Sequence, residues 1–600
     1  MLTFKTMIKN IQYDRLIVRI CFILFSLCFW GMCYPFHLAY QEQFQLFLFT
    51  SDYWVSKSTY PGGISEYIAE FLTQFHYYKW LGALIVTSLL VFVQILTHSL
   101  TLYMSRLKGT SADAWYYISY FPSVSAWVFL CDENNMLAGI ISLIMTLAVT
   151  WGYICVRKIY FRWIYAFAML PLLYWVAGGL CGLFLLWVLF CEAFVYVSSR
   201  RNFHLLFCLL LLLVAVACPY YCSSVLQYPP VRLITGIGYY RFPVGIPLAG
   251  IMVCLVSWLA VVVPLFLPPV NTEVRYRCHV LLLIIVALVG TGWIYFSCDW
   301  QKEKVIAYDY YVRTRQWNKV IEMAEKETPV TPLEVVSLNL ALAKTGQLGE
   351  RMFQFYQNGT AGLLPDFVRD FNVPLLVNEV YYHLGMINTS QRFTFEAMEA
   401  IPSYQKSVRC YQRLAETNII NGDYVVAGKY LRALSHTLFY RQWAEEALAC
   451  LSDEQKVNAH PEWGYLRTLL YDDDFLFDED QKDNMLGMLL KKNKSNKLAF
   501  EYLLAYELLD KNIEAFLKYY PLGKDMGYTA IPRSYQEVLL YIWTQQHTSF
   551  QGMPWSISPM LQKEVTEFAT AYVRNPTDES YFRQNFGKTY WYYLLFRGME

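Results

Sequence analysis

The residues of this sequence best suited to chemistry are six carboxylates in its first half. Residues 1–297 hold only 10 of the 48 Asp and Glu residues, so an acid in this part of the chain is uncommon. Glu66 and Glu70 are four residues apart, which places both on one face of a helix. Carboxylates act as general acids and bases and as ligands for hard cations. The six stand in two segments, 35–79 and 131–135: Glu42, Asp52, Glu66, Glu70, Asp132 and Glu133.

These two segments lie between apolar runs that are long enough to cross a membrane. A helix needs about 20 apolar residues to cross about 30 Å of hydrocarbon, and a windowed hydropathy reading finds about nine such runs. The fifth and sixth are short and joined only by Ala177-Gly178-Gly179, so they form either two spans or one re-entrant hairpin. The expected spans are 15–34, 80–104, 114–130, 136–156, 161–177, 180–198, 203–221, 243–267 and 279–297.

Basic residues set the direction in which these spans cross. They occur in every second gap, so a cytoplasmic N-terminus puts 13 of the 17 Lys and Arg residues of 1–297 inside, as the positive-inside rule expects. Lys57, Lys79, Arg232 and Arg241 then remain outside. The first run lacks a small-residue cleavage site and is expected to stay as an anchor. An odd number of spans then puts residues 298–600 on the far side of the membrane. For a Gram-negative bacterium this predicts an inner-membrane protein whose C-terminal half lies in the periplasm.

Three outer segments follow from this orientation. The first, 35–79, is expected to place two short amphipathic helices, 44–49 and 64–75, in the membrane interface. The second is the turn 131–135, and the third, 222–242, carries two arginines. The carboxylates would then gather at one membrane surface. The structural alternative is that short outer loops are polar because they are exposed to water. In that case the acids of 64–75 form the solvent-exposed face of a helix.

Residues 298–600 form a second domain with a different pattern. It is helical throughout, with no alternating runs that would indicate a sheet. Four stretches share one phrase, in which a helix ends in a polar turn and the next helix begins about two residues later: 313–324, 340–348, 415–430 and 502–516. These phrases resemble tetratricopeptide-type (TPR) helix pairs. The resemblance implies an all-α fold, with a domain at 1–297 and an α-solenoid at 298–600 that presents a concave surface to a peptide or protein.

Other polar features have structural explanations that compete with functional ones. Glu192, the one acid inside an apolar run, is either functional or snorkels toward Arg200. The acidic runs 472–474 and 478–480 lack the glycine and spacing of a calcium loop, which favours a solvated loop. Of the 15 cysteines, 13 precede residue 300, mostly inside apolar runs, so we expect no disulfide framework. Residues 590–596 are expected to form a capping helix, with the membrane surface as one docking site.

The order of features in residues 1–297 resembles that of polytopic glycosyltransferases of the GT-C class, which use polyprenyl-phosphate-linked sugars. In that class a long outer loop with interfacial helices follows the first span and carries an early acid. The resemblance implies that Glu42, or Asp52, is the general base that deprotonates an acceptor hydroxyl. It also implies that Asp132 and Glu133 hold a divalent metal, Mg²⁺ or Mn²⁺, against the phosphate.

The same resemblance gives a role to the two outer arginines. Arg232 and Arg241 would clamp the phosphate of the lipid donor through bidentate hydrogen bonds. The helical repeats would then bind the acceptor or a partner protein of the cell envelope. No feature indicates a nucleic-acid partner.

The sequence as a whole also resembles a family of polytopic membrane proteins from Bacteroidetes-type bacteria that has no assigned activity. The most recognisable phrases are 60–67, 70–75 and 338–346. Two functions compete on this basis: a lipid-linked glycosyltransferase, and a non-enzymatic membrane scaffold whose repeats recruit an envelope partner. A transporter is disfavoured, since the spans show neither paired charges nor two matching halves interrupted by Gly and Pro.

Overall fold

The computed structural model describes residues 2–110, 113–196, 201–241, 248–267, 272–366, 373–401, 406–471 and 481–597. The chain divides into two compact units, and each is described by itself. Unit 1 comprises Met1–Glu303, Ile401–Arg409 and Ala433–Gln442, and unit 2 comprises Lys304–Ala400, Cys410–Arg432 and Trp443–Glu600. Helices make up both units, and the described residues contain no strand beyond one isolated bridge between Asn135 and Tyr240. The all-α prediction is thus confirmed.

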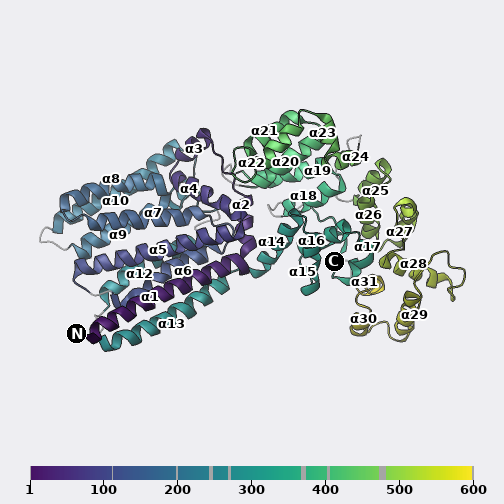
Figure 1. Cartoon of the computed structure of the whole chain (residues 1–600), viewed down its shortest axis with the longest axis horizontal. Coiled ribbons are helices and arrows are strands. Elements are labelled where there is room, and N and C mark those ends of the chain that lie inside the picture. The colour runs from purple at the N-terminus through teal and green to yellow at the C-terminus, as the bar shows by residue number, and fades with distance from the viewer. Residues whose placement is uncertain are drawn as a thin grey trace. The chain divides into compact units, whose positions relative to one another are not determined.

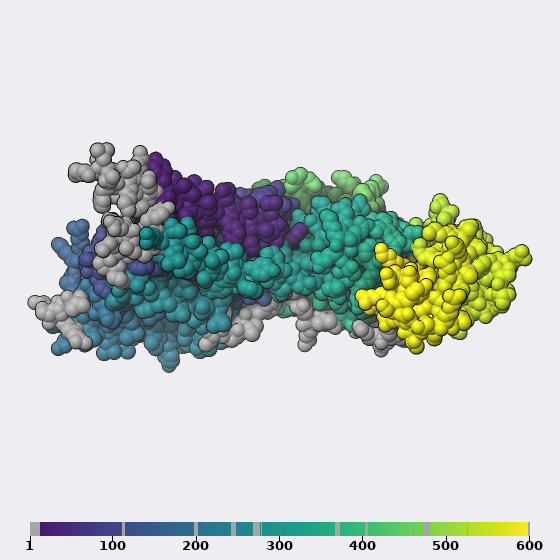
Figure 2. All heavy atoms as spheres, turned by 90° about the horizontal axis from the view of Figure 1, so that it is seen from below, coloured from purple at the N-terminus to yellow at the C-terminus, as the bar shows by residue number. Residues whose placement is uncertain are grey.

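Long apolar helices run side by side in unit 1 (Figure 1). Seven helical runs in the described residues are long and apolar enough to cross a membrane: Tyr13–Cys33, Lys79–Lys108, Leu137–Cys155, Ile159–Val195, Asn202–Val225, Leu248–Phe266 and His279–Ser297. Figure 2 shows α1, in purple, along one face of this unit, and leucine and isoleucine side chains such as Leu16, Ile17 and Leu24 on it are exposed. Exposed apolar helix surface is expected for a protein solvated by lipid.

The described helices of unit 1 begin and end as follows: α1 (Leu2–Cys28), α2 (Pro35–Gln43), α3 (Ser51–Ser58), α4 (Gly63–Thr73), α5 (Lys79–Lys108), α6 (Phe121–Leu130), α7 (Leu137–Cys155), α8 (Ile159–Ala177), α9 (Cys181–Phe190), α10 (Arg201–Val225), α11 (Pro230–Thr235), α12 (Leu248–Phe266) and α13 (Thr272–Ser297). Short 3₁₀ or π segments join several of them, among them η1 (Phe29–Cys33), η2 (Gln74–Tyr77), η3 (Asp113–Tyr120), η4 (Gly178–Leu180) and η5 (Cys191–Val195).

The structure does not confirm a count of nine spans, and the difference lies at two places. Residues 114–130 form η3 followed by the short α6, a tyrosine- and serine-containing stretch that is too polar to pass as one long apolar helix. The run from 159 to 195 reverses direction, since Arg162 near its start and Glu192 near its end form an ion pair of 2.9 Å. The reversal falls at Gly178, whose φ of +73° favours glycine.

One of the two expected interfacial helices is present and the other is not. Residues 64–75 are helical, as α4 and the first residues of η2. Residues 44–49, in contrast, form a turn at Phe44 followed by a segment without regular secondary structure, so that prediction is wrong. The backbone N–H of Phe49 donates to the carbonyl of His436, 2.9 Å away. This partner comes from the segment Ala433–Gln442, nearly 400 residues later in the chain, and no local pattern reveals it.

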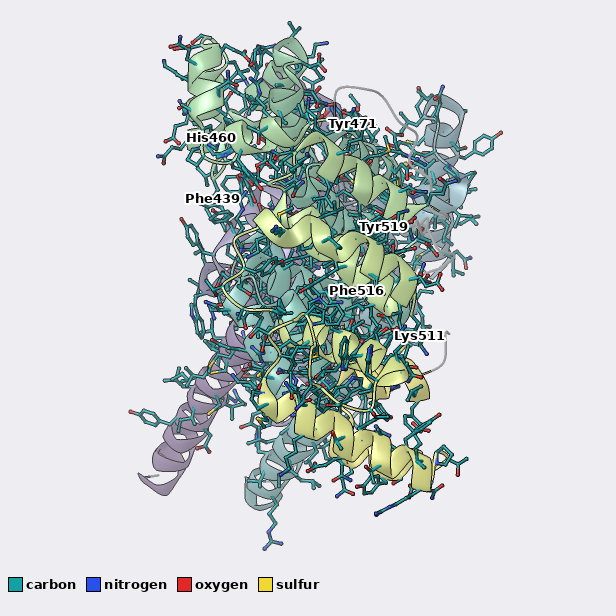
Figure 3. All side chains as sticks on the ribbon, turned by 90° about the vertical axis from the view of Figure 1, so that its right-hand side faces the viewer. Phe439, His460, Tyr471, Lys511, Phe516 and Tyr519 are labelled. Carbon is teal, nitrogen blue, oxygen red and sulfur yellow. The ribbon has the colours of Figure 1, made fainter. Side chains whose placement is uncertain are left out.

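The predicted helix–turn–helix phrases of the C-terminal half are confirmed. The pairs are α14 (Trp300–Arg313) with α15 (Trp317–Lys326), α16 (Pro332–Lys344) with α17 (Leu348–Arg351), α20 (Val408–Asn421) with α21 (Tyr424–Leu434), and α26 (Lys497–Leu509) with α27 (Ile513–Tyr519). Each turn holds one residue of positive φ: Arg315, Gly346, Gly422 or Lys511. Figure 3 labels Lys511 at the last of these turns and Phe516 and Tyr519 on the helix that follows. A left-handed residue just past a helix is a common C-terminal cap.

The remaining helices of this half are α18 (Val373–Leu384), α19 (Ile387–Glu399), α22 (Arg441–Cys450), α23 (Glu454–Ala459), α24 (Trp463–Leu469), α25 (Lys482–Lys492), α28 (Arg533–Gln546), α29 (Pro559–Arg574), α30 (Glu579–Phe586) and α31 (Tyr590–Phe596). The helices pair locally, but a regular solenoid is not confirmed. The acidic runs 472–474 and 478–480 lie outside the described residues.

The last helix, α31, packs into the core of unit 2. Tyr590 and Trp591 are fully buried, and the indole Nε1 of Trp591 donates to the carbonyl of Glu537 at 2.7 Å. The Glu537 carboxylate accepts from the backbone N–H of Tyr590 at 2.7 Å. These aromatic side chains are therefore core residues of unit 2 and do not face a membrane surface.

We expect Trp591→Ala to destabilise the full-length protein, because it leaves a large cavity and an unsatisfied carbonyl. Truncation of a buried Trp costs about 3–5 kcal/mol, so the melting temperature of the detergent-solubilised protein should fall by at least about 4 °C. Tyr581→Ala is the matched control, since Tyr581 on the neighbouring α30 is 45% exposed. An equal effect of the two substitutions would contradict a core role for α31.

Candidate functional site

A polar cavity of about 400 Å³ lies among the outer segments of unit 1. Two of its lining residues, Leu226 and Tyr228, directly follow the apolar run Asn202–Val225, so the cavity lies at the end of a candidate membrane span. Its lining combines apolar side chains with charged and hydroxyl groups. The lining comprises Gln45, Leu46, Leu48, Tyr53, Ser56, Lys57, Thr59, Tyr60, Glu66, Glu70, Leu226, Tyr228, Ile237 and Lys406.

The charged part of this lining is built around the ammonium of Lys57. Its Nζ lies 2.5 Å from Glu66 Oε1 and 2.9 Å from Glu70 Oε1. Helix α4 carries both carboxylates one turn apart, on the face that meets α3, and α3 carries Lys57 in its last turn. All three side chains are almost completely shielded from solvent. The predicted shared face of Glu66 and Glu70 is present, and it faces a cation and a cavity.

Tyrosines complete the cluster and affect its protonation. The hydroxyl of Tyr53 donates to Glu70 Oε2. Burial raises the pKa of Glu70, although Lys57 opposes the shift. Burial would lower the pKa of Lys57, but Glu66 and Glu70 outweigh it and raise that pKa well above its usual value. Lys57 therefore stays an ammonium, and the Glu70 carboxylate binds a proton more readily than an exposed glutamate does.

Three glycines allow the cluster to form. A Cβ on Gly63 would lie 1.7 Å from the carbonyl oxygen of Lys57, and a Cβ on Gly238 would lie 2.0 Å from Glu66 Oε2. Gly62 takes a φ of +85°, and a Cβ on it would lie 3.3 Å from the Cα of Gly178. The Gly62-Gly63 pair of the phrase at 60–67 is thus explained, because no side chain fits at either position.

A second, apolar cavity of about 210 Å³ is lined by residues of α7 and α12 and by the loops that follow α8 and α11. Ile140, Leu180, Ile251 and Val253 contribute apolar surface to it. The hydroxyl of Tyr239, also in its lining, accepts from the backbone N–H of Leu180 at 3.3 Å. Such a cavity suits a hydrocarbon group and has no evident acid–base chemistry.

The other expected catalytic acids do not line either cavity. Glu42 is 2% exposed, and both its oxygens accept from the hydroxyl of Tyr440, at 3.0 and 3.1 Å. Asp52 is exposed in the first turn of α3, where an acid stabilises the helix dipole. Their proposed role as general base stays a prediction, but the structure does not bring them to the Lys57 cluster.

The loop at 131–135 separates the two expected metal ligands. Asp132 is exposed and accepts from the backbone N–H of Asn134 at 2.9 Å. Glu133 is buried and forms an ion pair of 2.5 Å with Lys302. Within the described part of the chain, no three His, Cys, Asp or Glu side chains are grouped so that they could hold a metal ion. These carboxylates therefore do not fit a metal site on the geometry shown, and a metal there stays a prediction.

The two outer arginines also lie apart. Arg232 donates to the carbonyl of Ile237 at 3.2 Å, and Ile237 lines the polar cavity. Arg241 is buried, with its guanidinium 4.3 Å above the ring of Phe44 and its backbone N–H bonded to Asn134 at 2.7 Å. Burial lowers the pKa of the Arg241 guanidinium. Arg232 thus contacts a residue of the cavity lining. Arg241, in contrast, connects its own loop to Asn134 and to Phe44.

Comparison with known proteins assigns the chain to a family. Residues 9–597 match a family described as "Family of unknown function (DUF6057)". The chain belongs to this family. No curated protein and no solved structure is detectably similar to it. Because the family has no described function, the site has to be interpreted from its own geometry.

Glu303 caps the helix that carries Glu42. Its Oε1 accepts from the backbone N–H of Phe36 at 2.8 Å, at the first turn of α2. Burial raises the pKa of Glu303 from 4.5 to about 8, although the backbone N–H groups of Phe36 and His37 oppose the shift. The sequence shows an acid 267 residues away from its partner, so no local signal points to this cap.

The raised pKa of Glu303 predicts a pH-dependent stability. Between pH about 4.5 and about 8 the folded state keeps a proton that the unfolded state releases, so the free energy of unfolding falls as pH rises through this window. Glu303→Gln keeps an oxygen acceptor for Phe36 but cannot ionise. We expect its melting temperature to vary less with pH than that of the wild type between these values. If the melting temperatures of the two proteins changed equally with pH, the raised pKa of Glu303 would be contradicted.

An ion cluster lies inside the apolar helices of unit 1. Glu192 Oε1 is 2.9 Å from Arg162 Nε and accepts from Tyr153 at 2.6 Å, and Glu192 Oε2 lies 2.5 Å from His204 Nδ1. The guanidinium of Arg162 also stacks 3.5 Å from the ring of Tyr196. Of the two explanations for Glu192, a functional role and snorkelling, neither is tested, but the carboxylate is paired with Arg162; Arg200 lies outside the described residues. Arg162, counted in the sequence as a loop cation, is the missed partner.

Removing one member of this pair should be more harmful than removing both. A buried charge left without its partner costs about 3–5 kcal/mol, so we expect Arg162→Met and Glu192→Gln each to lower the melting temperature in detergent strongly. The double variant should recover part of the loss, since it leaves no unpaired charge. Additive losses in this double-mutant cycle would contradict direct coupling between the two side chains.

A second charged network, which the sequence does not signal, lies in unit 2. Arg413 pairs with Glu379 at 2.6 Å and with Glu416 at 2.8 Å, and its guanidinium lies 3.6 Å from the ring of Tyr382. Burial raises the pKa of Glu416 to about 7, although Arg413 opposes the shift. Nearby in the sequence of the same unit, His460, labelled in Figure 3, stacks on Trp463 at 3.8 Å. The Arg413–Glu379 pair joins α20 to α18, and the His460–Trp463 stack lies at the start of α24.

Proposed function

We propose that the chain is a membrane-embedded glycosyltransferase. It takes its sugar from a polyprenyl-phosphate donor at the periplasmic face of the inner membrane. The observation that carries the proposal is the polar cavity, in which Glu66 and Glu70 meet Lys57 at the end of a candidate span. A cavity at that level could receive a lipid-linked head group, while an acceptor approaches from the aqueous side. Its lining offers both acid–base groups and cations.

The charged groups of the cavity would act in such a transfer as a general base and as cations that stabilise the leaving phosphate. Glu70, or Glu66, accepts the proton of the acceptor hydroxyl as its oxygen bonds to the anomeric carbon of the donor. The bond from that carbon to the phosphate oxygen breaks, and polyprenyl phosphate leaves. Lys57 and Lys406 stabilise the negative charge of the departing phosphate. This assignment moves the base from Glu42 to the pair on α4.

We further propose a topology of nine crossings with the N-terminus in the cytoplasm of a bacterial inner membrane. The long helices supply most of the crossings, and the reversal at Gly178 divides one run into two. Residues 113–130 supply another, since Ser119 and Ser123 contact Gln94 and Leu90 of α5 at 2.8 and 2.7 Å in antiparallel order. The charge asymmetry of the gaps sets the direction and places the C-terminal half in the periplasm.

A second candidate function, a scaffold for envelope assembly, rests on the repeated helix pairs of the C-terminal half. Four turns share one left-handed residue two positions before the next helix, as repeated TPR-like units would. In this alternative a periplasmic α-solenoid binds an envelope protein or peptide and the membrane unit serves as an anchor. In the enzyme, the same surface would position the acceptor.

The enzyme proposal is tested with the full-length protein in lipid nanodiscs and a panel of polyprenyl-phosphate-linked glucose, mannose and galactose, with an envelope extract as acceptor source. Release of polyprenyl phosphate is measured. We expect turnover by the wild type, and a fall of about 100-fold or more for the variant of whichever acid is the base, Glu66→Gln or Glu70→Gln, since general-base removal has effects of that size.

The matched controls are Glu42→Gln and Asp52→Asn, which change carboxylates outside the cavity and should keep activity within about threefold of wild type. A loss in Glu42→Gln alone would return the base to that residue. Absence of both donor binding and turnover across the panel, in protein that keeps its melting temperature, would overturn the enzyme proposal in favour of the scaffold.

A further inference from the structure

Two cysteines that are 167 residues apart in the chain lie side by side at the outer end of unit 1. Cys131 directly follows α6 and Cys298 directly follows α13, and their sulfur atoms are 3.7 Å apart. Cys131 is buried and Cys298 is partly exposed. Both lie outside the seven long apolar runs, unlike cysteines such as Cys208 within them.

The backbones that carry these cysteines are held together by other contacts. The hydroxyl of Tyr34 lies 3.3 Å from the carbonyl oxygen of Cys131 and 3.5 Å from that of Asp299. Two residues beyond Cys131, Glu133 forms its 2.5 Å ion pair with Lys302. The proximity of the two sulfurs therefore does not depend on the thiols themselves, because a hydroxyl and an ion pair hold the same two segments.

We propose that Cys131 and Cys298 form a disulfide bond when this end of unit 1 reaches an oxidising compartment. The bond requires the sulfurs to approach from 3.7 Å to about 2.05 Å, a change that side-chain rotation can supply. Disulfides persist in the periplasm and are rare in the cytoplasm. The proposal thus rests on the proposed orientation, but not on the proposed enzyme activity.

The reaction is a thiol–disulfide exchange with the disulfide of an oxidoreductase of that compartment. Cys298, the more exposed thiol, attacks the oxidant as a thiolate, forms a mixed disulfide and releases one thiolate of the oxidant. Cys131 then loses its proton and attacks the sulfur of Cys298, which releases the second thiolate. The protein loses two electrons and two protons, and the oxidant is reduced to its dithiol. The neighbouring Cys131 thiol lowers the pKa of Cys298, which favours this order.

The bond would join the first turn after α6 to the first residue after α13, across most of the membrane unit. Closing a loop of this length restricts the unfolded chain strongly. It would also secure the segment 298–303, whose Glu303 caps α2. The disulfide would then link the turn at 131–135 covalently to the start of the C-terminal half.

The bond is tested on full-length protein isolated from bacterial membranes after free thiols have been blocked with an alkylating agent in the intact cells. Digestion without reductant should release a peptide pair joined through Cys131 and Cys298, which separates on reduction. Cys131→Ser, Cys298→Ser and the double variant should each lower the melting temperature by the same amount, about 4 °C or more. In wild type, reductant should produce that shift.

Cys208→Ser is the matched control and should leave both the linked peptide and the melting temperature unchanged. Alkylation of both Cys131 and Cys298 in the non-reduced wild-type protein would overturn the proposal. A periplasm-dependent phosphatase fused after Glu600 reports the orientation separately. An active fusion with unlinked cysteines shows that the bond itself is absent, and an inactive fusion shows that the orientation fails. Loss of donor turnover, in contrast, would bear only on the enzyme proposal.

Discussion

The ammonium of Lys57, held between the carboxylates of Glu66 and Glu70, is the interaction on which the charged lining of the polar cavity depends. Two buried carboxylates one helical turn apart repel each other and lose their hydration, and a shared cation offsets both costs. That cation joins α3 to α4, and the two helices form a wall of the polar cavity. Glycine at 63 and 238 leaves the space in which the three charged groups meet.

The same requirement governs the interior of the membrane unit. Hydrocarbon offers no hydrogen bonds, so a charge that lies among apolar helices has to be paired within the protein. Glu192 meets this condition through Arg162, from the other arm of a helical hairpin. Charge in unit 1 is therefore either paired inside or collected at the ends of the helices. This distribution makes the polar cavity the part of the unit where charged groups and apolar surface adjoin.

Pairing also separates the carboxylates that are available for chemistry from those that hold the fold. Glu42 is enclosed by Tyr440, Glu133 is bound to Lys302, and Glu303 caps a helix. Each of these partners comes from a segment far away in the chain, and two of them lie in residues that the sequence assigns to the soluble half. A pattern of acids in loops predicts their exposure, whereas long-range partners decide which of them stay accessible.

Composition and local periodicity determined the helical class, the apolar helices and the helix–turn–helix phrases of the C-terminal half, because each depends on residues within one or two turns of one another. The pairing of Glu66 with Glu70 on one face is local in the same way. Tertiary structure alone decided the rest. Lys57 completes the cavity cluster, Arg162 pairs with Glu192, and residues 44–49 are not helical. In each case the free energy comes from a partner that the chain brings close only when it folds.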